Sequence, residues 1–386
     1  MKKLCGLLCV LLLSGCSWMK FWEDDNDEAD LTAPAPLVDF DAEIQVKKIW
    51  RTGIGSGDED NVATLVPALD NGRVYAATND GEVVALDAAS GDRQWKTDLQ
   101  NPLSGGVGAG AGVVLVGDAD GEVIALAADT GKERWRIRLS SEIVSPPAAR
   151  GNVVAVQALD SKLYGLSVAT GETLWRHDGE TPVLSLRTVA TPVVTDSMVM
   201  AGFASGKLVA VSASDGSTLW EARVGVPKGR TELERMVDVS TPLLVDDVVY
   251  AASFQGRIAA LSRGTGRELW AQDGSSHSGL AFGEAQVYVV ETGDIVKALR
   301  ATGGQVLWTN DQMLNRRLTA PMAVNGYVAV ADGEGYLHLL SQVDGHFLAR
   351  IKVDGDGISV PMVASADTLY VLDNDGDVTA YQFDGK

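Results

Sequence analysis

The sequence predicts an all-β protein, an eight-bladed β-propeller with four-stranded antiparallel blades. Three observations predict this fold: a repeat that ends in tryptophan, the period of that repeat, and an incomplete strand pattern at each end of the chain. The repeat is clearest from Asp80 to Trp95 and returns almost unchanged from Asp120 to Trp135. A repeat with a fixed period indicates the architecture more strongly than any single element does. The tryptophans that end the complete copies are Trp95, Trp135, Trp175, Trp220, Trp270 and Trp308.

The period matches one propeller blade. Successive repeat tryptophans lie 40, 40, 45, 50 and 38 residues apart, and a four-stranded blade with its turns takes about 40 residues. In the first copy we expect strands over residues 64–69, 73–78, 82–87 and 92–98, because valine and aromatic residues favour strands. Gly, Asn and Asp fill the segments between them, which is typical of tight turns. One sheet of this size cannot bury both faces alone, so we expect the copies to stack into a ring.

The two ends of the chain predict how the ring closes. The seventh copy has Ala349 in place of tryptophan, and the eighth begins at Asp375 and ends before a fourth strand. A strand pattern from Val46 to Trp50 precedes the first complete copy. Pairing it with the last copy completes eight blades and leaves no open edge; rings of seven or nine blades are the alternatives. We interpret Trp50 and the six repeat tryptophans as packing anchors, each a large apolar side chain with one N–H to satisfy, rather than as ligand-binding residues.

The N-terminal segment predicts export and a lipid anchor. A basic start is followed by ten apolar residues, Leu4 to Leu13, which are too few to span a bilayer and are typical of a secretory signal. The next residues, Leu-Ser-Gly-Cys, resemble a bacterial lipoprotein box in which Cys16 is acylated; an ordinary signal with a chance cysteine is the alternative. We expect a lipoprotein signal peptide over residues 1–15, lipidated Cys16 with a flexible acidic and proline-rich tether over residues 16–42, and the propeller over residues 43–386. Several acyl chains would hold the chain on a membrane durably.

Composition and residue pattern predict a protein without chemistry of its own. The net charge of -20 and a pI of about 4.5 exclude nucleic-acid binding, which depends on clustered Lys and Arg. Once Cys5 and Cys9 leave with the signal and Cys16 is acylated, no thiol remains. The acidic stretches that begin at Asp118 and Asp373 occupy the turns of the repeat and lack the glutamate that closes a calcium loop. The histidines lie at unrelated positions of the repeat and lack metal-ligand spacing: His177, His277, His338 and His346. We therefore expect no catalytic residues, no metal site and no cofactor.

Two insertions depart from the repeat and predict a functional face. They cover residues 179–189 and 225–239, each between the fourth strand of one copy and the first strand of the next. In a four-stranded blade all such connections emerge on one face, so two neighbouring insertions would form one composite patch. Exposed loops on a rigid scaffold commonly carry function. The alternative is that both are merely tolerated insertions.

The repeat and the first insertion also carry a family resemblance. Across residues 45–386 the core Ala-Leu-Asp-x-x-(Ser/Thr)-Gly-x-x-x-Trp resembles the quinoprotein-type propeller repeat. With the lipoprotein box, the acidic tether and the Leu-Ser-Leu-Arg string ending at Arg187, the chain resembles the family of lipoprotein B subunits of the β-barrel assembly machinery. That resemblance implies a non-enzymatic scaffold on the periplasmic face of the outer membrane, which binds a POTRA domain of the integral barrel-assembly subunit through Leu184, Leu186 and Arg187. A second family determinant, Asp-Val-Asp, is matched here by Asp238-Val239-Ser240 at its first aspartate only, which implies a role for Asp238.

Two other function classes share this fold. A quinone-cofactor dehydrogenase uses the same repeat, but the chain lacks the adjacent cysteines and the acidic metal set that such enzymes carry. A propeller that binds cell-wall saccharide is an alternative by fold analogy alone. Within the scaffold hypothesis two modes of action stay open: the chain orients the domains of its partner, or it also engages nascent outer membrane proteins by pairing with their strands.

Overall fold

The computed structural model describes residues 32–55, 64–187, 190–353 and 356–385. The chain divides into two compact units, Met1–Ala33 and Pro34–Lys386. The predicted signal peptide, Cys16 and the first part of the predicted tether lie outside the described residues. Residues 34–42, which the sequence assigned to the tether, belong to the second unit. No helix long and apolar enough to cross a membrane occurs in the part of the chain that is described.

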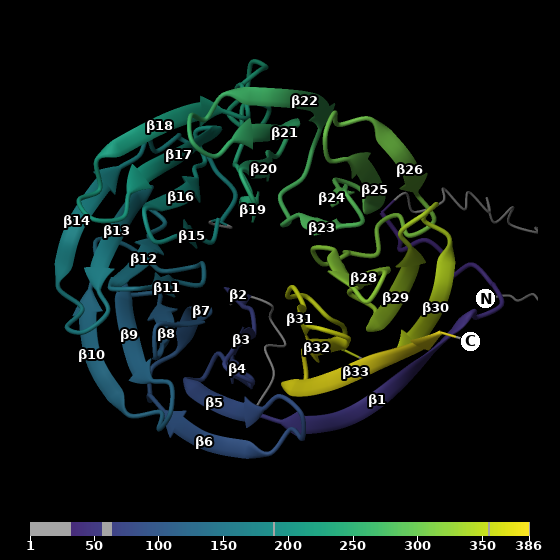
Figure 1. Cartoon of the computed structure of the whole chain (residues 1–386), viewed down its shortest axis with the longest axis horizontal. Coiled ribbons are helices and arrows are strands. Elements are labelled where there is room, and N and C mark those ends of the chain that lie inside the picture. Colours follow the sequence, from purple (N-terminus) through teal and green to yellow (C-terminus); the bar gives the residue numbers. More distant parts are fainter. Residues whose placement is uncertain (1–31, 56–63, 188–189, 354–355, 386) are drawn as a thin grey trace, which may run out of the picture. The chain divides into compact units, whose positions relative to one another are not determined.

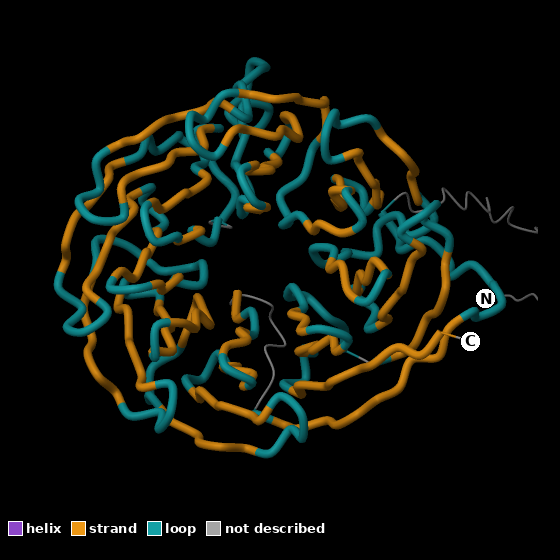
Figure 2. Tube along the Cα trace, in the orientation of Figure 1, coloured by secondary structure: helices purple, strands orange, loops and turns teal. Residues whose placement is uncertain are grey.

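The second unit is a ring of eight antiparallel sheets that follow one another in chain order around a central axis (Figure 1). Each blade has four strands, from an inner strand near the axis to an outer strand at the periphery (Figure 2). The four are consecutive in the chain in the first seven blades, and β2 adds a fifth strand to the sheet of the second blade. The predicted eight-bladed propeller is therefore confirmed. Blades one to four are β3 (Ala68–Asp70), β4 (Arg73–Ala77), β5 (Glu82–Asp87), β6 (Arg93–Asp98); β7 (Leu103–Gly110), β8 (Val113–Asp118), β9 (Glu122–Ala127), β10 (Glu133–Arg138); β11 (Ala148–Arg150), β12 (Val153–Gln157), β13 (Lys162–Ser167), β14 (Thr173–Asp178); and β15 (Val193–Val194), β16 (Met198–Gly202), β17 (Lys207–Ser212), β18 (Thr218–Arg223). Blades five to eight are β19 (Leu243–Val245), β20 (Val248–Ala252), β21 (Gly256–Ser262), β22 (Glu268–Gly274); β23 (Ala281–Gly283), β24 (Gln286–Glu291), β25 (Ile295–Arg300), β26 (Val306–Asn310); β27 (Met322–Val324), β28 (Tyr327–Ala331), β29 (Tyr336–Ser341), β30 (Phe347–Lys352); and β31 (Val363–Ser365), β32 (Thr368–Leu372), β33 (Asp377–Gly385), completed by β1 (Ile44–Gly53).

The ring closes as the chain ends predicted. Strand β1 pairs antiparallel with β33 from Ile44 opposite Gly385 to Gly53 opposite Asp377. The pairing runs beyond the Val46–Trp50 pattern at both ends and includes a bulge between Lys48 and Trp50. The last blade therefore consists of three strands from the C-terminus and one from the N-terminus, which leaves no open seam between the first blade and the last.

The first copy departs from its prediction at the inner strand. Residues 64–69 do not form one strand: β2 (Thr64–Leu65) adds in parallel to β7 of the second blade, and β3 alone is the inner strand of the first. Pro67 lies between β2 and β3, and proline has no N–H to continue a strand ladder. The backbone carbonyl of Val66 instead accepts a hydrogen bond from the Val107 amide at 2.7 Å.

The tryptophans join neighbouring blades. In Trp50 and in each of the six repeat tryptophans the indole Nε1 donates a hydrogen bond to a backbone carbonyl of the next blade, at 2.7 to 3.1 Å. The glycine of the next blade lies against the indole ring. At Gly171 a Cβ would stand 2.6 Å from the Trp135 ring, and φ is +75°. Glycine is therefore required there for both its conformation and its lack of a side chain.

The way the ring closes explains why the seventh blade has Ala349 where the other copies have a tryptophan. A tryptophan at the position of Ala349 would pack on the turn between the third and fourth strands of the eighth blade. That blade has no such turn, because β33 and β1 come from opposite ends of the chain. Ala349 is instead buried in a cluster with Ile44, Leu348 and Phe383. The small residue fits the space that the paired chain ends leave.

A candidate docking surface on two neighbouring loops

The two predicted insertions flank the fourth blade. The first loop, residues 179–192, connects β14 to β15, and the second loop, residues 224–242, connects β18 to β19. Two hydrogen bonds join them: the Leu186 amide donates to Asp238 Oδ1 at 3.0 Å, and the Thr191 amide donates to Thr241 Oγ1 at 3.0 Å. The structure thus brings Leu186 and Asp238 together, 52 positions apart in the chain, and the two loops form a single surface.

Asp238 lies beneath this surface rather than on it, with only 5% of its area exposed. Its Oδ2 accepts no hydrogen bond from the described residues, and neither does Oε1 of the buried Gln157. Both side chains line one small cavity between the loops, together with Ser185 and Leu186. The cavity has a volume of about 20 Å³, which is room for about one water molecule.

The burial of Asp238 has an electrostatic cost. A carboxylate removed from water favours its neutral form unless charges or hydrogen bonds compensate for the lost hydration. Burial raises the pKa of Asp238 to about 6, although the hydrogen bond from the Leu186 amide acts in the opposite direction. Asp238 therefore positions the first loop from below and has almost no exposed area to offer a partner directly.

The first loop presents apolar side chains to solvent. Val183 is 86% exposed and Leu184 is 42% exposed, whereas Leu186 is half-buried above Asp238. Single exposed apolar residues are common on protein surfaces. Here two adjacent ones lie on a loop whose backbone is fixed at Leu186, so the exposed pair is held in a defined place.

Arg187 already has a carboxylate partner in its own chain. Its guanidinium forms an ion pair and a hydrogen bond with Glu142, in the connection between β10 and β11. About half of the Arg187 side chain stays exposed. The ion pair links the first loop to the adjacent connection on the same face.

The second loop has a compact turn of its own. The Glu234 carboxylate accepts hydrogen bonds from the amides of Arg230 at 2.6 Å and Thr231 at 3.1 Å, and these bonds lower the pKa of Glu234. The Glu234 amide donates in return to Thr231 Oγ1 at 3.2 Å. The turn presents Leu233, 63% exposed, and its carbonyl accepts a hydrogen bond from Gln255 Nε2 at 3.2 Å. The composite surface therefore has apolar positions on both loops.

Sequence reasoning missed Glu142 and Gln157. Each is a single polar residue in an otherwise ordinary copy of the repeat, so no sequence pattern marks it. Glu142 pairs with Arg187 and Gln157 lines the cavity with Asp238 only because neighbouring blades pack together. Thr241 had a partial signal, because it belongs to one of the Thr-Pro pairs that follow the insertions. The contacts of these residues arise only once the blades are stacked.

Other candidate sites have structural explanations. Asp118 Oδ1 accepts hydrogen bonds from the amides of Asp120 and Glu122 within its own turn, and Asp373 Oδ1 accepts one from Asp377. Among the described residues no group of three or more His, Cys, Asp or Glu side chains is placed to hold a metal ion. The glycine-rich segment 105–110 lies in β7, where a Cβ on Gly108 would stand 1.8 Å from the Pro147 carbonyl oxygen. Close approach of two backbones explains that glycine.

Comparison with known proteins identifies the family. A family model described as outer membrane protein assembly factor BamB matches residues 40–102, 79–310 and 292–386. A relative of that name from Pseudomonas aeruginosa is 47% identical over 376 residues, which cover 97% of this chain and 97% of the relative. The Escherichia coli (strain K12) relative of the same name is 34% identical over 385 residues, 97% of this chain and 96% of the relative.

Solved structures agree with the sequence relatives. The crystal structure of BamB from Moraxella catarrhalis has a TM-score of 0.80 and 28% sequence identity, covering 88% of this chain and 100% of that one. A quinohemoprotein alcohol dehydrogenase from Comamonas testosteroni has a TM-score of 0.66 at 14% identity, covering 87% of this chain and 76% of that one, which is a likeness of fold alone. The chain belongs to the family of the outer membrane protein assembly factor BamB.

Proposed function

We propose that the chain is a non-enzymatic scaffold of the outer-membrane β-barrel assembly machinery, and that its two loops dock a periplasmic POTRA domain of the integral barrel-assembly subunit. The hydrogen bond between Leu186 and Asp238 carries the proposal, because it joins the two sequence determinants in one surface. The relatives are named outer membrane protein assembly factors, which supports the assignment to this machinery. Acylation of Cys16 would hold the scaffold on the periplasmic face of the outer membrane.

The docking surface has the features of an interface centre. Leu184 and Val183 are exposed and adjacent, and Leu186 and Arg187 follow on a loop fixed from below by Asp238. Apolar and arginine side chains near the middle of an interface commonly carry most of the binding free energy, and removing one costs about 2 kcal/mol or more. A loop that is ordered before binding loses little further entropy on association.

The direct test compares two leucines of similar exposure. Leu184 on the first loop is 42% exposed, and Leu174 on the outer strand β14 is 45% exposed. Leu184→Ala should weaken binding to the purified POTRA domains about 30-fold, as expected for ~2 kcal/mol, while Leu174→Ala should leave binding unchanged. Titration calorimetry measures both. Equal affinities for the two variants would place the docking surface elsewhere.

Reversing the charge of Arg187 tests the electrostatic contribution of the same surface. Arg187→Glu would set two carboxylates together at the position of the Arg187–Glu142 ion pair and would reverse the charge offered to a partner. Pull-down of the barrel-assembly subunit should fail for this variant, with the circular dichroism spectrum and the melting temperature close to those of the wild type. Undiminished recovery by a folded variant would reject the site.

Two further measurements test the scaffold assignment. A bound quinone absorbs in the visible range, so the purified full chain should show no such absorption if it is a scaffold and not a dehydrogenase. Fractionation of cells that carry Cys16→Ser should move the protein from the outer membrane to the soluble periplasm. Membrane retention of this variant would show that acylation of Cys16 is not the anchor.

A further inference from the structure

The segment before the first strand does not leave the propeller where β1 begins. From Ala35 to Glu43 the chain follows the seventh blade, and we name these residues the strap. The Glu43 amide donates to the Leu348 carbonyl at 2.9 Å, and the Ala35 amide donates to the Leu314 carbonyl at 2.8 Å. The strap is thus bonded near both of its ends, although its composition resembles that of the tether.

Two arginines bind the strap through its carbonyl oxygens. Arg316 Nη1 donates to the Ala35 carbonyl at 2.9 Å, and Arg350 Nη1 donates to the Val38 carbonyl at 2.8 Å. Arg316 comes from the connection between β26 and β27, and Arg350 from the outer strand β30. Each guanidinium contacts a different part of the strap, so together they hold it along the blade.

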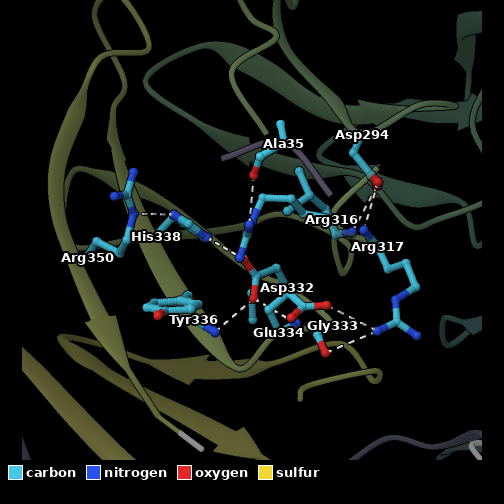
Figure 3. Close-up of polar contacts among 12 residues, drawn as sticks. Ala35, Asp294, Arg316, Arg317, Asp332, Gly333, Glu334, Tyr336, His338 and Arg350 are labelled. Atoms are coloured by element: carbon cyan, nitrogen blue, oxygen red, sulfur yellow. Dashed lines mark hydrogen bonds and ion pairs between the residues drawn. The ribbon is translucent and has the colours of Figure 1, made fainter. Parts of the chain in front are cut away.

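A buried network fixes both arginines, and we name Arg316, Asp332, His338 and Arg350 the clasp (Figure 3). Asp332 Oδ2 accepts hydrogen bonds from Arg316 Nε at 2.6 Å and from His338 Nε2 at 2.9 Å. Arg350 Nε donates to His338 Nδ1 at 3.2 Å. His338 therefore donates through one ring nitrogen and accepts through the other, and it has a neutral ring. The burial that lowers the pKa of His338 agrees with this form.

His338 of the clasp lies at a position that is apolar or aromatic in the first five blades, Lys297 in the sixth and Thr379 in the eighth. In the first five blades the position equivalent to His338, opposite the fourth residue of the second strand, holds an apolar or aromatic residue: Val84, Ile124, Tyr164, Val209 and Ala259. Asp332 and His338 have no exposed side-chain area. Burying ionisable groups is costly unless hydrogen bonds satisfy them, and here the network ends on the strap carbonyls.

Aromatic contacts add to the hold on the strap. Phe40 of the strap stacks on Phe347 with ring centroids 5.3 Å apart. The Arg350 guanidinium lies 4.9 Å from the Phe40 centroid and 5.0 Å from the Phe347 centroid. A guanidinium beside aromatic rings is attracted to their faces. Phe40 thus anchors the middle of the strap between the two hydrogen-bonded ends.

The strap crosses the height of the blade. In each blade the outer strand ends on the face that carries the outer-to-inner connections, so β1 begins at Ile44 on the opposite face. Arg316 and Leu314 belong to one of those connections, residues 311–321. In chain order, the strap therefore runs from the face that carries the two docking loops, at Ala35, to the opposite face, where β1 begins at Ile44.

We propose that the clasp fixes the departure point of the N-terminal tether on the docking-loop face, beside the connection between the sixth and seventh blades. Without it, the chain would leave the propeller at Ile44 on the other face, nine positions later in the sequence than Ala35. The consequence for assembly depends on the proposed lipid anchor and docking function, but the departure point itself does not.

The experiment measures strap release separately from function. Arg350→Ala removes the Val38 hydrogen bond and the stacked cation. The matched control is Arg176→Ala, because Arg176 occupies the same position of the outer strand in the third blade and pairs only with Asp178 in the described contacts. Hydrogen exchange at the Ala35 amide should accelerate at least about tenfold in the full-length Arg350→Ala protein, as expected for the loss of a hydrogen bond to a charged group. It should be unchanged in Arg176→Ala.

A distance measurement checks the departure point. Spin labels at Pro34→Cys and Val183→Cys should give a narrow distance distribution in the otherwise wild-type chain and a broad one with Arg350→Ala. Equal exchange rates and equal distributions in both backgrounds would overturn the clasp. POTRA binding in solution should be unaffected by Arg350→Ala, whereas outer-membrane barrel assembly by the anchored chain should fall. If the strap is released and assembly is unaffected, the departure point has no role; if POTRA binding is absent in the wild type, the proposed function fails and the clasp stands.

Discussion

Replacing Asp238 by asparagine separates its charge from its role as a hydrogen-bond acceptor. The asparagine Oδ1 can still accept the Leu186 amide, but the side chain no longer ionises. The folded-state pKa is about 6 against an ordinary value of 3.8, a difference of about two units, at 1.36 kcal/mol each. Because the pKa is higher in the folded state, the contribution of Asp238 to the free energy of unfolding is largest below pH 3.8. It is lost as the pH rises through 6. Above pH 6 the wild type should therefore be destabilised by up to ~3 kcal/mol relative to its protonated state.

The assay is urea unfolding of the wild type and Asp238→Asn between pH 5 and pH 8. The difference in free energy of unfolding should grow in favour of the variant by about 1.4 kcal/mol over this interval, roughly half of the full effect. Parallel pH dependence of the two proteins would refute the reasoning, since it would mean that Asp238 is not a strained buried carboxylate.

Asp238→Ala provides the complementary result. It removes the charge and also the acceptor for the Leu186 amide, so the first loop loses its fixed point. We expect weaker POTRA binding for Asp238→Ala and near-normal binding for Asp238→Asn at pH 7.5. Equal binding losses in both variants would indicate a direct contact of the carboxylate with the partner instead of a positioning role.

The remaining predictions concern the blade contacts. Gly171→Ala should lower the free energy of unfolding in urea more than Gly151→Ala does. Both positions have positive φ, but an added Cβ would meet the Trp135 ring at Gly171, whereas at Gly151 it would meet nothing within 4 Å. The conformational term common to both is about 1 kcal/mol, and the clash at Gly171 should add ~1–3 kcal/mol; equal losses would show that the indole ring yields without cost. Ala349→Trp, which restores the repeat residue, should lower rather than raise the free energy of unfolding by ~1–3 kcal/mol, because the paired chain ends fill the space. A stabilised variant would contradict this account of the closure.

Much of the architecture was predictable because its signals are local and repeated. The glycine four residues before each tryptophan, the turn residues and the constant spacing define a blade without any knowledge of distant contacts. The incomplete last copy and the strand pattern ending at Trp50 predicted the closure, since a ring of sheets has to pair its free edges. The two insertions were visible as departures from the period.

The sequence could not show which of the predicted partner-binding residues are exposed and which are buried. The partial Asp-Val-Asp match at Asp238 suggested that this residue contacts the partner, but Asp238 is buried and bonded to Leu186. Glu142 pairs with Arg187 only because two connections meet on one face. Such contacts depend on the packing of separate blades, which single-residue patterns do not encode.

The sequence by itself determined the ring, its eightfold repeat and the place of its insertions, because backbone pairing and tryptophan packing repeat at a fixed period. The tertiary structure alone decided that residues 35–43 are a strap and that the buried Asp332–His338 pair holds the arginines which bind it. A proline-rich acidic segment has no core of its own, so its order comes from the blade it lies against. That order depends on hydrogen bonds between residues far apart in the chain, 281 positions for Ala35 with Arg316 and 312 for Val38 with Arg350, and only the folded ring brings them together.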